Sequence, residues 1–377
     1  MIDPLNFLAT LKSEKVDFFA GVPDSLMKGL SLALSNSCSD IEHTITNNEG
    51  GAIAQAIGHF ASTQNPAVVY MQNSGLGNAY NPLVSLADDK VYGIPMLLLI
   101  GWRGEIDENG TQLKDEPQHV KQGQVTLKTL EALQIPYSVF KTDSNNWPNE
   151  IRKLVRLSVA ERRPVAAVFC KNTFKIPQKP LAPLKILPAL RREEAIEHVV
   201  ESCNANDVFV ASTGMISREL LEVRKRKNLS TASDFLTVGG MGHASQIAIR
   251  ISKVKTKRRV ICLDGDGSLL MHAGGLLECG KQPNFVHVVL NNGAHDSVGG
   301  QPTNAFDINL RDVARGFGYQ NVILANSSLE IKKSFTYKKT GSSFIEIQCR
   351  RGSRDDLGRP DKLPVENLND FMKFLKS

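Results

Sequence analysis

The sequence predicts an α/β protein with two domains, each built on a doubly wound parallel sheet. Strand-like apolar runs of four to six residues alternate with amphipathic or glycine-rich segments along the chain, which is typical of parallel sheets covered on both faces by helices. Residues 171–190 break this alternation with four prolines, so they can form neither a regular helix nor a central strand. We therefore expect domains at residues 1–170 and 191–377, joined by a linker at residues 171–190.

The expected strands are runs of β-branched and other apolar residues. In the first domain they are Val16–Ala20, Ala67–Met71, Pro95–Ile100 and Val165–Cys170. In the second domain they are Val208–Ala211, Phe235–Val238, Arg259–Leu263, Phe285–Leu290 and Ser343–Gln348. The second domain opens with an expected amphipathic helix at Arg191–Ser202, because an acidic first turn precedes apolar residues at helical spacing. The two domains share this alternation of strands and helices but no repeated sequence.

Length and composition narrow the class of protein. A chain of 377 residues with 41% hydrophobic and 22% charged residues suits two globular domains. It has no run of eighteen apolar residues, and Met1–Thr10 lacks the pattern of a secretory signal, so we expect a cytoplasmic protein with no membrane partner. The six cysteines form no C-x-x-C pair, which favours buried reduced thiols over a zinc ribbon or a disulfide framework.

The net charge of +6 raises the question of nucleic-acid binding. The basic clusters Arg224–Lys227 and Lys255–Arg259 have no interleaved aromatic residues, so we interpret them as solvated helix ends and expect no nucleic-acid partner. A modest positive field would still steer small anionic substrates toward the protein.

The strongest chemical signal is Gly265-Asp266-Gly267-Ser268, which follows an apolar strand and precedes a helical stretch from Leu269. Glycines allow a ligand to approach the backbone, and an aspartate there could hold a metal that bridges phosphate oxygens. The next strand ends in Asn291-Asn292, which places more oxygen ligands at a neighbouring strand end. An ordinary βα turn is the alternative for the Gly-Asp-Gly segment alone. The third glycine of a dinucleotide fingerprint is missing, since Leu270 stands in its place.

Gly-Asp-Gly followed after 23 residues by Asn-Asn resembles the signature of the thiamine-diphosphate-dependent enzymes. The resemblance implies two domains, one for the pyrimidine and one for the diphosphate of thiamine diphosphate, and a Mg2+ ion. The chain has no room for the middle domain of larger family members. It implies metal ligation by Asp266, Asn292 and the Ala294 carbonyl group. The other cofactor-binding residues that it implies are Thr213, Gly214, Met215, Gly239, Met241, Gly265, Gly267 and Ser268. For Met241, filling the core is the alternative role.

The family also needs a carboxylate in the first domain that exchanges a proton with the aminopyrimidine ring, and Glu49 matches that position. It follows a strand and begins a helix of small residues, Gly50–His59. A general acid–base role requires a carboxylate placed within hydrogen-bond reach of the ring. A carboxylate that stabilises the helix N-terminus is the alternative.

Further segments resemble the phosphonopyruvate decarboxylase branch of the family, to which the sulfopyruvate decarboxylases are close. They are Gly21–Ser25, Tyr70–Asn78, Gly101–Gly104, Asp115–Gly123, Asn292–Gln301 and Leu357–Pro360. The resemblance implies decarboxylation of 3-phosphonopyruvate to phosphonoacetaldehyde and CO2 by carbanion and enamine chemistry, in phosphonate biosynthesis. Sulfopyruvate decarboxylation is the alternative, and a carboligase is a more distant one.

A phosphonate or sulfonate needs cationic partners, and arginine suits such oxygens because it binds them with two parallel hydrogen bonds. Our candidates for this anion site are Arg103, Lys114, Lys121, Arg354 and Arg359. Besides Glu49, the candidate catalytic residues are Asp24, which could instead cap a helix together with Ser25, and His119 and His295, which could relay protons or be structural. The resemblance also implies a homodimer or a dimer of dimers in which active sites are shared between chains.

Overall fold

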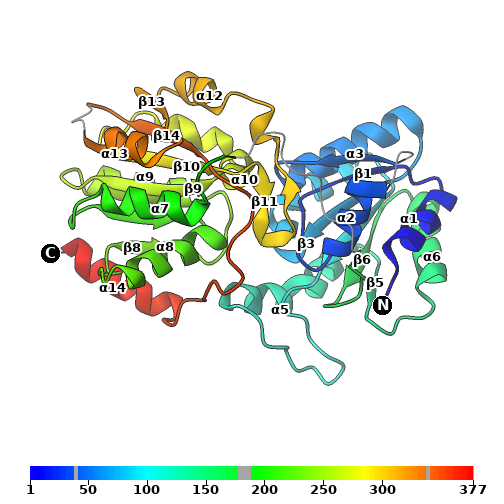
Figure 1. Ribbon diagram of the computed structural model, residues 1–377. Helices are drawn as coiled ribbons and strands as arrows, with labels where there is room; N and C mark the ends of the chain where they lie inside the picture. Colours follow the sequence, from blue (N-terminus) through cyan, green and yellow to red (C-terminus); the bar gives the residue numbers. More distant parts are fainter. Residues whose placement is uncertain (38–40, 177–187, 337–339, 377) are drawn as a thin grey trace. The chain divides into compact units, whose positions relative to one another are not determined.

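The computed structural model describes residues 1–37, 41–176, 188–336 and 340–376. It divides into two compact units, Met1–Ala182 and Pro183–Ser377 (Figure 1). Residues 171–176 of the expected linker belong to unit 1, where Phe174 joins the core and pairs with Ile2, whereas residues 177–187 lie outside the described residues. Among the described residues, no helix is long and apolar enough to cross a membrane.

Unit 1 is built on a six-stranded sheet in which every neighbouring pair of strands is parallel. Its strand order is β2-β1-β3-β4-β6-β5. Alternate residues of the central strands are buried on opposite faces, as Tyr70 and Met71 show. The strands are β1 (Phe18–Gly21), β2 (Glu42–Ile45), β3 (Ala67–Gln72), β4 (Met96–Gly101), β5 (Tyr137–Phe140) and β6 (Pro164–Phe169).

Helices cover both faces of this sheet. One apolar core contains residues of α1 (Pro4–Ser13), α2 (Lys28–Ser37) and α6 (Trp147–Glu161), and the core on the opposite face contains residues of α3 (Glu49–Thr63), α4 (Leu76–Pro82) and α5 (Pro117–Ala132). Short helical turns follow β3 and α4, at η1 (Asn73–Gly75) and η2 (Leu83–Ala87).

Unit 2 repeats this topology without a repeated sequence. Its parallel six-stranded sheet has the order β13-β14-β10-β9-β7-β8, and counted within the unit from the β8 edge this is again 2-1-3-4-6-5. The strands are β7 (Val208–Ala211), β8 (Asp234–Leu236), β9 (Val260–Gly265), β10 (Phe285–Asn291), β13 (Asn321–Leu324) and β14 (Ser343–Gln348). The predicted α/β fold with two parallel sheets is therefore confirmed.

The two faces of the second sheet have separate apolar cores. One contains residues of α7 (Arg192–Glu201), α8 (Met215–Arg226) and α13 (Ser328–Thr336). The other contains residues of α9 (Ala244–Val254), α10 (Asp266–Met271), α11 (Leu276–Cys279), α12 (Leu310–Gly316) and α14 (Pro364–Lys376). The remaining elements are η3 (Ala273–Gly275), the antiparallel pair β11 (Ala294–His295) and β12 (Gln301–Pro302), η4 (Asp296–Val298) and η5 (Asn304–Phe306).

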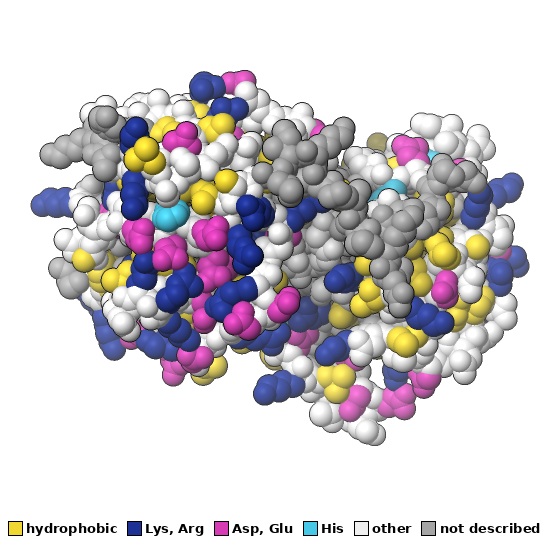
Figure 2. Space-filling view, viewed as in Figure 1, with side chains coloured by type: hydrophobic (Ala, Val, Ile, Leu, Met, Phe, Trp, Pro, Cys, Tyr) yellow, Lys and Arg dark blue, Asp and Glu magenta, His cyan; other side chains and the backbone are white. Residues whose placement is uncertain are grey.

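The basic cluster Arg224–Lys227 is paired with carboxylates. Arg224 is buried and binds Asp234, and its three neighbours bind exposed or half-exposed aspartates and glutamates. Figure 2 shows basic and acidic side chains intermixed over this part of unit 2. The cluster lies at the end of α8 as expected, but it is neutralised rather than simply solvated. The five described cysteines are unpaired thiols, four of them buried, and Cys38 lies outside the described residues.

Candidate active site

The carboxylate of Asp266 lies buried where β9 passes directly into α10. Its side chain is 2% exposed and accepts hydrogen bonds from the Thr303 hydroxyl group and the backbone N–H of Asn292. Burial raises the pKa of Asp266 to about 6, although both hydrogen bonds oppose that shift. Burial therefore disfavours the ionised form of the Asp266 carboxylate in the protein without a ligand. A cation bound beside Asp266 would stabilise that form.

The second candidate oxygen ligand for a metal follows the neighbouring strand β10. Asn292 follows this strand, its side chain is 2% exposed, and its Oδ1 atom accepts from the N–H of Ala294 over 3.2 Å. A carboxylate and a carboxamide oxygen at the ends of adjacent parallel strands suit a hard divalent cation such as Mg2+. The side chain of Gln301, on β12, is fully buried and neither of its polar atoms has a hydrogen-bond partner; its strand pairs with β11, which begins two residues after Asn292. These residues therefore fit a Mg2+-bound diphosphate.

The other predicted cofactor-binding segments of unit 2 meet at Ser268. Its hydroxyl group accepts from Ser212, next to the predicted Thr213–Met215 turn, over 3.0 Å and from the N–H of Gly242 over 3.1 Å. Three segments that follow β7, β8 and β9 thus converge around the Gly265–Ser268 motif. Met241 is only partly buried, so it does not fill the core, and Gly214, before α8, has φ +90°. Gly239 lies in the same loop as Met241.

His295 lies against the Gly-Asp-Gly segment. A Cβ atom at Gly267 would lie 2.9 Å from the imidazole, so only glycine allows this packing. Burial lowers the pKa of His295 to about 4. The ring is therefore neutral near pH 7, whereas the sequence led us to expect a pKa near neutrality for a proton relay.

In unit 1, Glu49 is the first residue of α3 and is 5% exposed. Asn48 caps the helix by accepting from the N–H of Gly51 over 2.8 Å, and the Nδ2 atom of Asn78 donates to Glu49 Oε2 over 2.8 Å. A Cβ atom at Gly75 would lie 2.5 Å from Glu49 Oε1, so the glycine leaves room for the carboxylate. Since Asn48 already caps the helix and Glu49 is held by Asn78, capping does not explain the burial of Glu49.

A second group in unit 1 surrounds Arg103, which follows β4. Its guanidinium group forms a two-pronged ion pair with Asp115 and donates to the Ser25 hydroxyl group over 3.2 Å. His119 contacts the same Asp115 carboxylate through Nδ1 at 3.1 Å. Asp24, after β1, is fully buried, and its Oδ2 atom accepts from the N–H of Leu26 over 3.1 Å. We call Asp24, Ser25, Arg103, Asp115 and His119 the Arg103 cluster.

The titratable groups of the Arg103 cluster have displaced pKa values. Burial raises the pKa of Asp24 to about 6, and the positive charge of Arg103 opposes this shift. Burial also favours the neutral form of Asp115, but hydrogen bonds from Arg103, the backbone of Glu116 and His119 outweigh it and hold the pKa of Asp115 well below its usual range. Burial and the nearby Arg103 lower the pKa of His119, so this ring too is neutral near pH 7.

The other predicted anion-binding cations are exposed or already form ion pairs. Lys114, Lys121 and Arg359 are exposed. Arg354 forms ion pairs with Glu193, Glu222 and Asp356, so its guanidinium group is already surrounded by carboxylates.

The polar stretch at residues 105–114 forms a small hairpin closed by an Ile106–Gln112 bridge. A groove of about 420 Å³ beside this hairpin, lined by Trp102, Leu127 and their neighbours, contains none of the candidate site residues.

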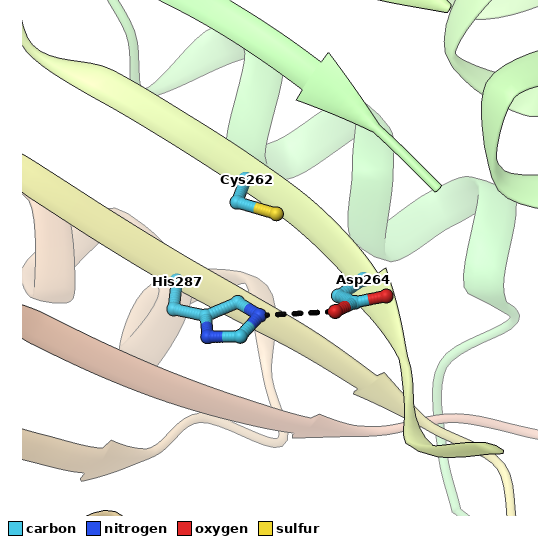
Figure 3. A group of neighbouring side chains, drawn as sticks. All are labelled: Cys262, Asp264 and His287. Carbon is cyan, nitrogen blue, oxygen red and sulfur yellow. Dashed lines mark hydrogen bonds and ion pairs between the residues drawn. The ribbon is translucent and has the colours of Figure 1, made fainter. Parts of the chain in front are cut away.

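Cys262, Asp264 and His287 form a buried group on β9 and β10 whose possible metal-ligating atoms lie within 4.8 Å of one another (Figure 3). Hydrogen bonds satisfy its polar groups. His287 contacts Asp264 Oδ2 at 3.2 Å and the Tyr319 hydroxyl group at 2.9 Å, and Asp264 Oδ1 accepts from the N–H of Gly265. Burial raises the pKa of Cys262 well above its usual value, which disfavours a metal-binding thiolate. We therefore interpret this group as a link between the two strands that end just before Asp266 and Asn292.

Sequence reasoning did not identify the partners of the candidate residues. Asn78, Asp115 and Asp296 lie inside segments that carried the family resemblance, so those segments were the available signal. Thr303 and Arg192 carried none, because both act through contacts between residues far apart in the chain.

Comparisons with known proteins identify the family of the chain. Residues 6–130 match the family model "Thiamine pyrophosphate enzyme, N-terminal TPP binding domain", and residues 210–347 match the model of the C-terminal TPP binding domain. A phosphonopyruvate decarboxylase of Streptomyces viridochromogenes is 30% identical, with 100% of this chain and 95% of the relative covered. One from Streptomyces hygroscopicus is 31% identical, with 99% and 94% covered. A sulfopyruvate decarboxylase of Methanosarcina acetivorans is 27% identical, with 91% and 90% covered.

Proposed function

The chain belongs to the thiamine pyrophosphate enzymes, and on this basis we propose that it decarboxylates 3-phosphonopyruvate to phosphonoacetaldehyde and CO2. The observation that carries the chemistry is the convergence of Asp266 and Asn292, from adjacent strands, in one buried oxygen-rich site. The full-length similarity to two phosphonopyruvate decarboxylases supports the substrate. Thiamine diphosphate, when bound, supplies a carbon nucleophile and accepts the electrons that CO2 leaves behind.

We assign Mg2+ binding to Asp266, Asn292 and the Ala294 carbonyl group. The segments around Ser268 would contact the diphosphate, since their backbone N–H groups and hydroxyl groups meet there. Glu49 would exchange a proton with the aminopyrimidine ring, and Asn78 would orient its carboxylate. Glu49 and Asp266 belong to different units, and the family resemblance implies that such units meet across chains, so we also propose a homodimer or dimer of dimers with shared active sites. The cytoplasmic location remains a prediction from the sequence.

Within unit 1, we assign the anionic end of the substrate to the Arg103 cluster. Of the candidate cations, Arg103 alone combines partial burial with a place at the carboxyl edge of the parallel sheet, where α/β proteins bind their ligands. Asp24 and His119 lie next to it and could hold or accept a proton during turnover.

The test offers phosphonopyruvate, sulfopyruvate and pyruvate separately to the full chain with thiamine diphosphate and Mg2+, and measures CO2 and aldehyde. We expect phosphonopyruvate to react at least about a hundredfold faster than pyruvate, since about 1.4 kcal/mol of lost transition-state binding is tenfold in rate. The Glu49→Gln variant controls for spontaneous decarboxylation. A preference for sulfopyruvate would move the chain to the neighbouring branch, CO2 release without aldehyde would indicate a carboligase, and a preference for pyruvate would refute the substrate assignment.

A further inference from the structure

The side chain of Asn292 has one defined orientation. Its Nδ2 atom donates to Asp296 Oδ2 over 2.6 Å. A carboxylate accepts hydrogen bonds and cannot donate them, so the group that faces Asp296 must be the NH2 end of the amide. The carboxamide oxygen is thereby turned toward Ala294 and away from Asp296. Without Asp296, the amide could rotate and present its NH2 group to a cation, which it cannot ligate.

Asp296 is itself held by groups from two other parts of unit 2. Its Oδ2 atom also accepts from Arg192 Nη1 over 2.7 Å and from the backbone N–H of Gly352 over 2.9 Å. Arg192 is 4% exposed, and its remaining nitrogens bind both oxygens of buried Glu219 over 2.7 and 2.9 Å. The order of contacts is therefore Glu219, Arg192, Asp296 and Asn292.

We propose that Glu219, Arg192 and Asp296 are positioning residues that hold the carboxamide oxygen of Asn292 in the orientation that binds Mg2+. This inference rests on the proposed function, because it assigns Asn292 to the metal. The two buried side chains at its remote end form a rigid pair, and Arg192 transmits that rigidity to Asp296 through a charge-assisted bond. The residues come from α7, α8 and η4, so the metal site depends on contacts well outside the Gly-Asp-Gly and Asn-Asn segments.

A matched control exists in the same unit. Arg224 and Asp234 form a buried, two-pronged ion pair like that of Arg192 and Glu219, but its further contacts are to Ser233 and the Phe209 ring, not to a predicted metal ligand. A variant that breaks this pair should lower stability without altering metal binding.

The experiment measures calorimetric binding of thiamine diphosphate to the full-length protein over a range of Mg2+ concentrations. We expect Asp296→Ala to weaken the apparent Mg2+ affinity roughly 10- to 100-fold, as replacing residues that orient metal ligands usually does. Asp296→Asn should lose less, because its carbonyl oxygen can still accept from Asn292. Asp234→Ala should bind Mg2+ like the wild type while unfolding at a lower temperature.

Each outcome of these binding measurements supports or contradicts the positioning role of Asp296. Wild-type Mg2+ affinity in Asp296→Ala, or equal weakening in Asp296→Ala and Asp234→Ala, would overturn the positioning role. If Asp296→Ala does not fold, Asp296→Asn and Arg192→Lys replace it, and wild-type affinity in both would be equally contrary. If the wild-type chain shows no Mg2+-dependent cofactor binding, the proposed function itself fails, which is a separate outcome.

Discussion

Replacing Asp24 with asparagine should stabilise unit 1 above pH 6 while it reduces activity. Asp24 is fully buried, and its Oδ1 atom has no hydrogen-bond partner. Burial raises its pKa from 3.8 to about 6 despite the nearby positive charge of Arg103. A buried carboxyl group that favours its neutral form opposes folding whenever the pH forces it to ionise. Asparagine has nearly the same shape, and its carbonyl oxygen can still accept from the N–H of Leu26.

The sign and size of the effect follow from proton linkage. Between pH 3.8, the ordinary pKa, and about 6, the folded chain binds more protons at Asp24 than the unfolded chain, so stability falls as pH rises through this window. The contribution is fully present below the unfolded pKa and is lost above the folded pKa. About two pKa units at roughly 1.4 kcal/mol each make a difference of about 3 kcal/mol. Asp24→Asn should recover up to that amount at pH 7.5 and little at pH 4.

Tryptophan fluorescence during urea unfolding measures this effect in unit 1, because both tryptophans of the chain, Trp102 and Trp147, belong to that unit. The quantity to compare is the free energy of unfolding of Asp24→Asn minus that of the wild type, at several pH values from 4 to 8. Glu42→Gln removes an exposed carboxylate from β2 and controls for the loss of one negative charge. A variant less stable than the wild type at pH 7.5, or a difference independent of pH, would refute the reasoning.

Three other predictions concern the proposed chemistry. Glu49→Gln should bind the cofactor normally but lose most turnover, and its deuterium exchange at the thiazolium carbon should slow; unchanged exchange would restrict Glu49 to a structural role. Mixed Glu49→Gln and Asp266→Ala chains should regain partial activity if sites are shared, whereas no recovery after verified subunit exchange would count against sharing. Arg103→Ala should lower activity on phosphonopyruvate far more than on pyruvate, and Arg354→Ala, which disturbs a surface ion-pair group, should not change that ratio. Equal losses on both substrates in Arg103→Ala would remove Arg103 from the anion site.

The central strands of both sheets could be predicted from the sequence, whereas three of the four edge strands could not. All nine expected strands exist within two residues of their predicted bounds. Eight of them are central strands, which need continuous apolar runs because both faces are buried, and the ninth, β8, is an edge strand. The strands β5 and β13, which were not predicted, and β2, expected only as an unlocated strand before Glu49, are sheet edges and mostly half-buried. An edge strand has one neighbour and a solvent side, so its sequence can be polar. The pair β11 and β12 was missed because strands of two residues leave no periodicity.

The residues of the candidate site also differ in how far the sequence alone could identify them. Asp266 and Asn292 could be proposed because they stand at strand ends beside glycines, and Glu49 could be proposed because it matches a position in the family resemblance. Arg192 could not, since it acts on Asp296 from 104 positions away. The sequence could not rank the candidate cations for a related reason. Ion pairing depends on the tertiary structure, and only the fold shows that Arg354 is surrounded by carboxylates whereas Arg103 lies beside a buried aspartate.

The charges of the Arg103 cluster explain how it could bind a multiply charged substrate. Arg103 and Asp115 neutralise each other, so a phosphonate gains little net attraction from that ion pair alone. Asp24 changes this balance, because its pKa of about 6 is close enough to neutrality for an anion bound nearby to raise it further. Binding of the substrate would then be coupled to protonation of Asp24, which removes one negative charge and leaves a proton donor next to the bound molecule. A phosphonate, with more negative charge than a sulfonate, would drive this protonation more strongly. On this argument Asp24 and Arg103 together, rather than Arg103 alone, discriminate between the two substrates.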